Sequence, residues 1–132
     1  MLDAAVRWIR RHALAGGGIA VSSQQRVAYP EVTGYFIPTL LGLGERELAQ
    51  QFSDWLVSVQ RPDGAFVGPA SDEIFAFDTG QVVRGWVALL PTQPAIEGPL
   101  RRACDWLLAA SVPATGQLPV PPPGGAWSLG PR

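Results

Sequence analysis

Apolar residues recur at helical spacing in five segments of the chain, and these segments are of two kinds. Residues 2–13, 45–60 and 96–111 are amphipathic, with an apolar stripe on one side and charged side chains on the other. Residues 31–43 and 78–90 are apolar on all sides, and Arg84 is the only charge in either after its first residue. Because a helix that is apolar all round belongs in an interior, the pattern predicts an all-α protein with helices in the order outer, inner, outer, inner, outer.

Several residues mark the ends and irregularities of these helices. Pro38 lies inside an inner helix, where its ring clashes with the carbonyl of Gly34, so a kink is expected there. Asp78 and Gln81 have the spacing of a capping box, which predicts Asp78 as the residue that caps its helix. Residues 113–132 are rich in Pro and Gly. We therefore expect a helical domain over 1–112 and an extended tail over 113–132.

Short motifs repeat along the chain and predict that the helices form pairs. Asp54-Trp55-Leu56 recurs as Asp105-Trp106-Leu107, and Thr33-Gly34 recurs as Thr79-Gly80 at the start of the second inner helix. These intervals of about 50 residues are typical of helix-pair repeats in solenoids and closed toroids. One core cluster is predicted from the apolar stripes, made of Phe52, Trp55, Leu56, Val83, Trp86 and Leu107, with Arg46, Glu47, Arg101 and Arg102 outside it.

Composition narrows the choice of partners. The 132 residues suit one domain, of which 47% are hydrophobic and only 16% charged, so apolar surface is left for a partner to cover. The net charge is -1 and the chain has no lysine, which argues against nucleic acid and anionic membranes as partners. No apolar run reaches the roughly 18 residues of a membrane span, and residues 1–3 lack the pattern expected of a signal peptide. We expect a cytoplasmic protein without a membrane span.

Cofactor and metal chemistry are not expected. Cys104 is the only cysteine and His12 the only histidine, about ninety residues apart, so neither a disulfide nor a zinc site is predicted. Cys104 lies within a helical pattern and is expected to be a buried thiol. No phosphate-binding loop, dinucleotide fingerprint or serine nucleophile elbow occurs.

Three segments carry a resemblance to a known group of proteins. They are residues 29–41 (YPEVTGYFIPTLL), 60–66 (QRPDGAF) and 77–82 (FDTGQV). Together they resemble bacterial α/α toroid proteins that are encoded with polysaccharide-biosynthesis genes. These are similar to the six-hairpin glycosidases and to the prenyltransferase and squalene cyclase group. The resemblance covers about residues 2–118 and implies a toroid fold, of which this chain would supply about five helices rather than twelve.

The resemblance implies a site at the mouth of the inner helices. In toroids that act on sugars, acids at this mouth serve as general acid and base, and aromatic side chains stack on the sugar. Glu31 and Asp78 stand at the starts of the two inner helices and are the candidate catalytic residues. Candidate substrate-binding residues are Tyr29, Tyr35, Phe77, Gln81 and Trp86. The structural alternative is that Asp78 caps its helix, that Glu31 is a first-turn acid and that the aromatic residues fill the core.

Three functions remain open. The first is a carbohydrate-active toroid of the hydrolase, lyase or epimerase type with a saccharide ligand. The second is a non-catalytic helical-repeat module, and the third is an isoprenoid-binding or cyclising relative, although the Asp-x-Asp-Asp motif of the cyclases is absent. Because two inner helices form only one wall of a pocket, we expect self-association or a partner chain through the apolar segments 32–43 and 78–90.

Overall fold

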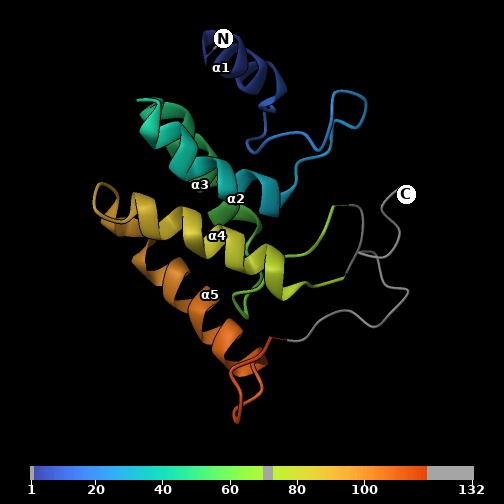
Figure 1. Cartoon of the computed structure of the whole chain (residues 1–132), viewed down its shortest axis with the longest axis vertical. Coiled ribbons are helices and arrows are strands. Elements are labelled where there is room, and N and C mark those ends of the chain that lie inside the picture. Colours follow the sequence, from blue (N-terminus) through green and yellow to red (C-terminus); the bar gives the residue numbers. More distant parts are fainter. Residues whose placement is uncertain (1, 70–72, 119–132) are drawn as a thin grey trace.

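The computed structural model of the protein describes residues 2–69 and 73–118. Figure 1 shows its helices: α1 (Leu2–His12), α2 (Pro30–Gly42), α3 (Arg46–Val59), α4 (Ala76–Leu89) and α5 (Glu97–Ala110), with a 3₁₀ turn at Pro94–Ile96 before α5. The described residues form isolated β-bridges but no strand. The all-α prediction is confirmed, and each helix begins and ends within two residues of its predicted limits.

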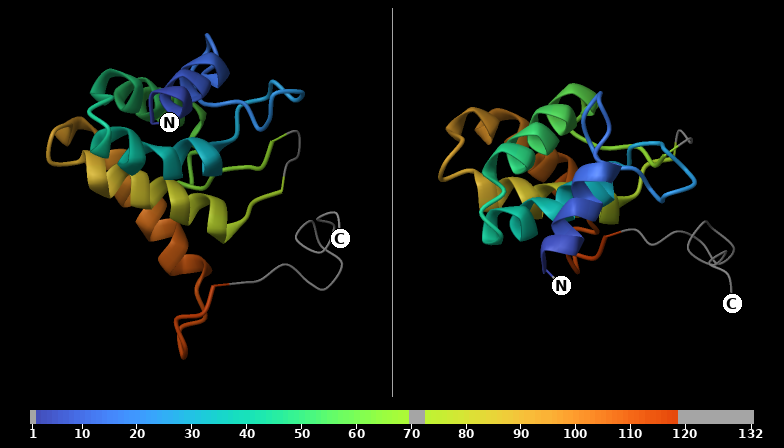
Figure 2. Two further views of the ribbon diagram at one scale, coloured as in Figure 1. Left: turned by 45° about the horizontal axis from the view of Figure 1, so that its top comes forward. Right: turned by 90° about the horizontal axis from the view of Figure 1, so that it is seen from above.

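Helices α2 and α4 lie side by side at the centre of the fold. They make the most extensive contact between any two helices, while α3 packs mainly on α2 and α5 on α4. Figure 2 shows α2 and α4 running in the same direction, so that both begin at the same side of the molecule. Both helices contribute completely buried side chains to the core, among them Ile37 and Leu40 from α2 and Val82 and Trp86 from α4. The two helices lie at the centre of the fold as predicted, although α4 also exposes Phe77 and Val87. Closure into a toroid stays a prediction.

Two glycines allow α2 and α4 to approach closely. A Cβ atom added to Gly34 would lie 2.7 Å from the Cα of Val82, and one added to Gly85 would overlap the carbonyl oxygen of Gly34. The carbonyl of Gly34 also lacks its usual helical hydrogen bond, because the donor would be the N–H of residue 38, and Pro38 has none. The helix pair therefore depends on the absence of side chains at both positions.

The connections after α1 and α3 have the same hydrogen bonds. After α1, Leu14 N–H donates to Gly18 O (3.0 Å) and Gly17 N–H to Leu14 O (2.9 Å). After α3, Arg61 N–H donates to Ala65 O (3.1 Å) and Gly64 N–H to Arg61 O (2.9 Å). Gly17 and Gly64 both have a positive φ, of 94° and 98°. The sequence repeat is thus also a repeat of backbone conformation.

A related turn follows α5. Val112 N–H donates to Gln117 O (2.8 Å), Gly116 N–H donates to Val112 O (2.7 Å), and Gly116 has a φ of 67°. Residues 112–117 therefore form a third, slightly longer copy of the turn. The predicted boundary between domain and tail at residue 113 falls inside this turn, and the Pro-rich part of the tail from residue 119 lies outside the described residues.

One threonine in the first turn of each inner helix fixes the preceding connection. The Thr33 hydroxyl accepts the backbone N–H of Ile19 (3.1 Å) and donates to the Tyr29 carbonyl (2.7 Å). In the second repeat the Thr79 hydroxyl accepts the backbone N–H of Phe66 (3.2 Å). Both threonines are completely buried. The repeated Thr-Gly motif therefore has a structural cause, since its threonine satisfies a buried backbone donor.

The core differs from the predicted cluster at one position. Phe52, Leu56 and Trp86 are fully buried, and Trp55 and Val83 pack against them. The prediction was wrong for Leu107, which lies outside this cluster because its side of α5 is partly exposed. The four charged residues placed outside the core, Arg46, Glu47, Arg101 and Arg102, are exposed as predicted.

Alanine substitutions at the two glycines of α4 should distinguish the effect of close helix packing on stability from the effect of helix propensity. We expect Gly85→Ala to lower the free energy of unfolding by at least about 1 to 3 kcal/mol, because the new methyl group meets the backbone of α2. Gly80→Ala is the matched control, since no atom lies within 4 Å of its added Cβ. It should stabilise the protein by about 0.5 to 1 kcal/mol. Urea unfolding of both variants measures the difference, and equal effects would contradict the packing assignment.

Candidate functional site

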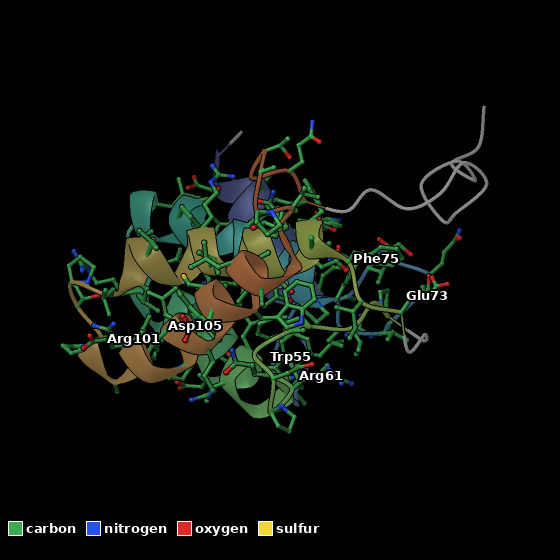
Figure 3. The ribbon with its side chains drawn as sticks, turned by 90° about the horizontal axis from the view of Figure 1, so that it is seen from below. Trp55, Arg61, Glu73, Phe75, Arg101 and Asp105 are labelled. Atoms are coloured by element: carbon green, nitrogen blue, oxygen red, sulfur yellow. The ribbon has the colours of Figure 1, made fainter. Side chains whose placement is uncertain are left out.

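The candidate site lies at the side of the molecule where α2 and α4 both begin. Tyr29 and Phe75 are the residues that precede the two helices, and each has an extended backbone (φ -122° and -113°). Pro30 follows Tyr29 at the first helical position, where its fixed φ favours the helix. Figure 3 shows Phe75 on the opposite side of the molecule from Arg101 of α5. The parallel helices thus present their positive ends on one side.

Asp78 does not cap α4, so the capping-box prediction was wrong. The helix begins at Ala76, before Asp78, and its capping position is occupied by Phe75. No side chain makes a capping hydrogen bond to the start of α4. Asp78 is instead a first-turn acid that points into the protein, and it is completely buried.

The carboxylate of Asp78 lies beside the Tyr29 hydroxyl but makes no contact of full hydrogen-bond geometry among the described residues. Neither Oδ1 nor Oδ2 meets the geometry of a hydrogen bond. Burial raises the pKa of Asp78 from 3.8 to about 6, and the neighbouring Tyr29 hydroxyl only partly offsets this. A buried carboxylate normally has partners for its oxygens, because removing it from water is costly. The unsatisfied oxygens therefore point to a group that the protein alone does not supply.

Glu31 and the two tyrosines belong to the same electrostatic cluster. Burial raises the pKa of the half-buried Glu31, and the charge of Asp78 raises it further. Burial likewise raises the pKa of Tyr29, with further contributions from Asp78 and Glu31, and that of Tyr35, with a contribution from Glu31. The predicted acids are thus brought close enough to interact, and both tyrosines lie beside them.

The remaining predicted binding residues have different environments. Phe77 is 47% exposed in the first turn of α4, and Gln81 is half-buried one turn further along. Trp86 is completely buried, its indole N–H donates to the Ser53 hydroxyl (3.1 Å), and its ring meets Phe66 edge to face. A sugar cannot stack on a ring that has no exposed surface, so the assignment of Trp86 as a binding residue is corrected to a core role.

The charge of the cluster limits its chemistry. The groups that shift the pKa values of Glu31, Asp78, Tyr29 and Tyr35 are all acidic, and no arginine is among them. Within the described residues, no group of three or more His, Cys, Asp and Glu side chains is arranged to hold a metal ion. The site can hold and release protons and accept hydrogen bonds from a ligand. It is better suited to a neutral or cationic ligand than to an anionic one.

A second polar contact was not anticipated from the sequence. The imidazole of His12, at the end of α1, lies 2.9 Å from the Ser23 hydroxyl in the connection to α2. The sequence argued against a metal site at His12 and pointed to no partner for its imidazole. Its partner lies in an irregular segment that carries no recognisable motif, so the pairing required the folded chain.

Comparisons of the chain with protein-family models, with curated proteins and with solved structures find no match. The resemblance to α/α toroids therefore rests on the sequence segments alone and stays a prediction. Among the described residues, no helix combines the length and the apolar character needed to cross a membrane.

The buried Asp78 should make stability depend on pH in a defined direction. Its pKa is higher in the folded protein than in the unfolded chain, so the folded state binds more protons, and stability falls as the pH rises from about 4 to 6. The difference between 3.8 and about 6 corresponds to about 3 kcal/mol. We therefore expect Asp78→Asn to gain stability relative to wild type by about this amount between pH 4 and pH 7.

Urea unfolding at both pH values measures this effect. Glu31→Gln serves as comparison and should show the same sign with a smaller size, because Glu31 is only half-buried. A difference between Asp78→Asn and wild type that does not change with pH would show that Asp78 is not a buried, unpartnered acid.

Proposed function

We propose that Glu31 and Asp78 are an acid–base pair that acts on a saccharide. The observation that carries this proposal is the complete burial of Asp78, with no contact of full hydrogen-bond geometry, beside Tyr29 and a second carboxyl group from the neighbouring inner helix. Paired carboxyl groups with raised pKa values are the arrangement with which proteins move protons at a glycosidic or sugar carbon. The resemblance to six-hairpin glycosidases supports the same class of ligand.

The two acids have environments that suit different roles. Asp78 is completely buried, with a pKa of about 6, so a fraction of it is protonated near neutral pH. It can donate that proton only to a ligand that displaces the side chains covering it. Glu31 is half-buried and reaches solvent, so it can act as the base or nucleophile. Tyr29 and Tyr35 would contact the sugar through their rings and hydroxyl groups. The acidic surroundings favour neutral or amino sugars over uronic acids.

Activity against a panel of oligosaccharides tests this proposal. Neutral, amino-sugar and uronate oligomers are incubated with the protein, and new reducing ends, unsaturated products and epimers are measured separately. Asp78→Asn and Glu31→Gln should each reduce turnover by about a hundredfold or more, since general acid–base catalysis contributes that much. Asp105→Asn, an exposed acid on α5, is the control and should leave turnover unchanged. Product formation that survives both site substitutions would contradict the assignment.

The pH dependence of turnover identifies the role of Asp78. If Asp78 donates the proton, kcat/KM falls as the pH rises through about 6, because the carboxyl group loses the proton that it must give. We expect this fall, and we expect it to disappear in the residual activity of Asp78→Asn. A rate that instead rises through the same pH range would make Asp78 the base.

A second candidate function is an interaction module, and the exposed apolar residues of α4 and α5 favour it. Val87 is 56% exposed and Leu108 is 72% exposed, although both belong to helices that are otherwise part of the core. The predicted self-association through the inner helices would cover Val87, and Leu108 extends the apolar surface onto α5. This reading and the catalytic one are compatible if a second copy supplies further walls of the site.

Light scattering at micromolar concentration should show association of the wild-type chain. Val87→Asn combined with Leu108→Asn should shift the protein towards the monomer, because polar side chains disfavour burial of this surface. Val57→Asn on α3 is the matched control, since Val57 is 38% exposed on an outer helix. A monomeric wild type would contradict self-association through this surface and leave a different partner chain as the ligand of the module.

A further inference from the structure

The only histidine of the chain is held in one orientation by three neighbours. His12 is 9% exposed at the end of α1, and its Nδ1 lies 2.8 Å from the carbonyl oxygen of Trp8. A carbonyl can only accept, so Nδ1 carries a hydrogen, and in the neutral ring Nε2 is left as the acceptor. The imidazole also stacks on the indole of Trp8, with ring centroids 3.9 Å apart and an angle of 21° between the planes.

The acceptor nitrogen faces a serine hydroxyl. Nε2 of His12 lies 2.9 Å from Oγ of Ser23, so the hydroxyl donates its hydrogen to the imidazole. Ser23 is exposed, which leaves its oxygen accessible to a substrate. A hydroxyl, a base within hydrogen-bond distance and a third group that orients the base are the parts of an activated nucleophile. Here the Trp8 carbonyl takes the orienting role.

The backbone at Ser23 leaves two N–H groups without an acceptor among the described residues. The segment is closed by hydrogen bonds from Val21 N–H to Val27 O (3.0 Å) and from Gln25 N–H to the Ser22 hydroxyl (3.0 Å). Within the described part of the chain, the N–H groups of Ser23 and Gln24 make no hydrogen bond. Unpaired N–H groups beside a nucleophile can stabilise the oxyanion formed in acyl transfer.

We propose that Ser23 and His12 are a nucleophile–base pair that accepts acyl groups from carboxylic esters, at a site made of residues other than Glu31 and Asp78. In the first step Oγ of Ser23 bonds to the acyl carbon while its proton moves to Nε2 of His12. The carbon–oxygen bond to the leaving alcohol then breaks, and that alcohol takes the proton from Nε2. Water, deprotonated by His12, attacks the acyl-serine, releasing the carboxylic acid and restoring the Ser23 hydroxyl.

The composition of the chain makes this proposal simple to test, because it has no lysine to react with acylating reagents. The wild-type protein is mixed with p-nitrophenyl acetate, release of p-nitrophenolate is followed, and the acetylated residue is identified by fragment mass spectrometry. We expect a burst of one equivalent per chain and acetylation at Ser23. Ser23→Ala should abolish the burst, whereas Ser58→Ala, which removes an exposed serine on α3, should leave it unchanged.

The role of His12 is tested separately from its contribution to folding. His12→Ala should slow acetylation of Ser23 about a hundredfold or more, the usual contribution of a general base. Circular dichroism shows whether this variant keeps its helices, and imidazole added to the buffer should restore part of the rate. Acetylation of a residue other than Ser23, a wild-type rate equal to that of Ser23→Ala, or an unchanged rate in His12→Ala would overturn the proposal.

Discussion

The close contact between α2 and α4 at Gly34 and Gly85 is the constraint on which the rest of the structure depends. Because neither position has a side chain, the two backbones approach until a Cβ at either would meet the other helix. This approach brings the first turns of both helices together and covers Asp78 completely. The site therefore owes its burial, and with it the raised pKa of Asp78, to packing one or two turns away.

The internal repeat explains how the two acids come to occupy different environments. Thr33 and Thr79 hold equivalent positions, since each anchors the connection that precedes its helix. With these threonines aligned, Glu31 corresponds to Phe77, and Asp78 follows Phe77 by one residue. Successive helical residues differ in direction by about 100°, so the two acids cannot point the same way from their helices. One acid is therefore turned into the protein, while the other reaches solvent.

The sequence was sufficient to predict the helices, but it did not predict the roles of all the side chains. Alternation between amphipathic and fully apolar segments predicted all five helices, because burial imposes that pattern directly. The pattern could not show that Leu107 lies outside the core, because the apolar stripe of α5 extends past the edge of the core. The capping box was misread because α4 begins before Asp78, and helix ends depend on the approaching chain as much as on spacing. Trp86 was misassigned for a related reason, since a buried indole and a sugar-stacking indole have the same sequence signal.

The environment of Asp78 argues for a role outside folding. Its burial costs about 3 kcal/mol at neutral pH, which is a substantial part of the roughly 5 to 15 kcal/mol that stabilises a domain. The fold offsets only part of this cost through the neighbouring Tyr29 hydroxyl, because the carboxylate does not cap α4 and no contact to it reaches full hydrogen-bond geometry. An unsatisfied buried group of this kind indicates either strain stored for function or a partner that binds from outside. Glu31 and Tyr29 beside it make a ligand that carries hydrogen-bond donors the simplest such partner, because its donors would satisfy the oxygens that the protein leaves unpaired.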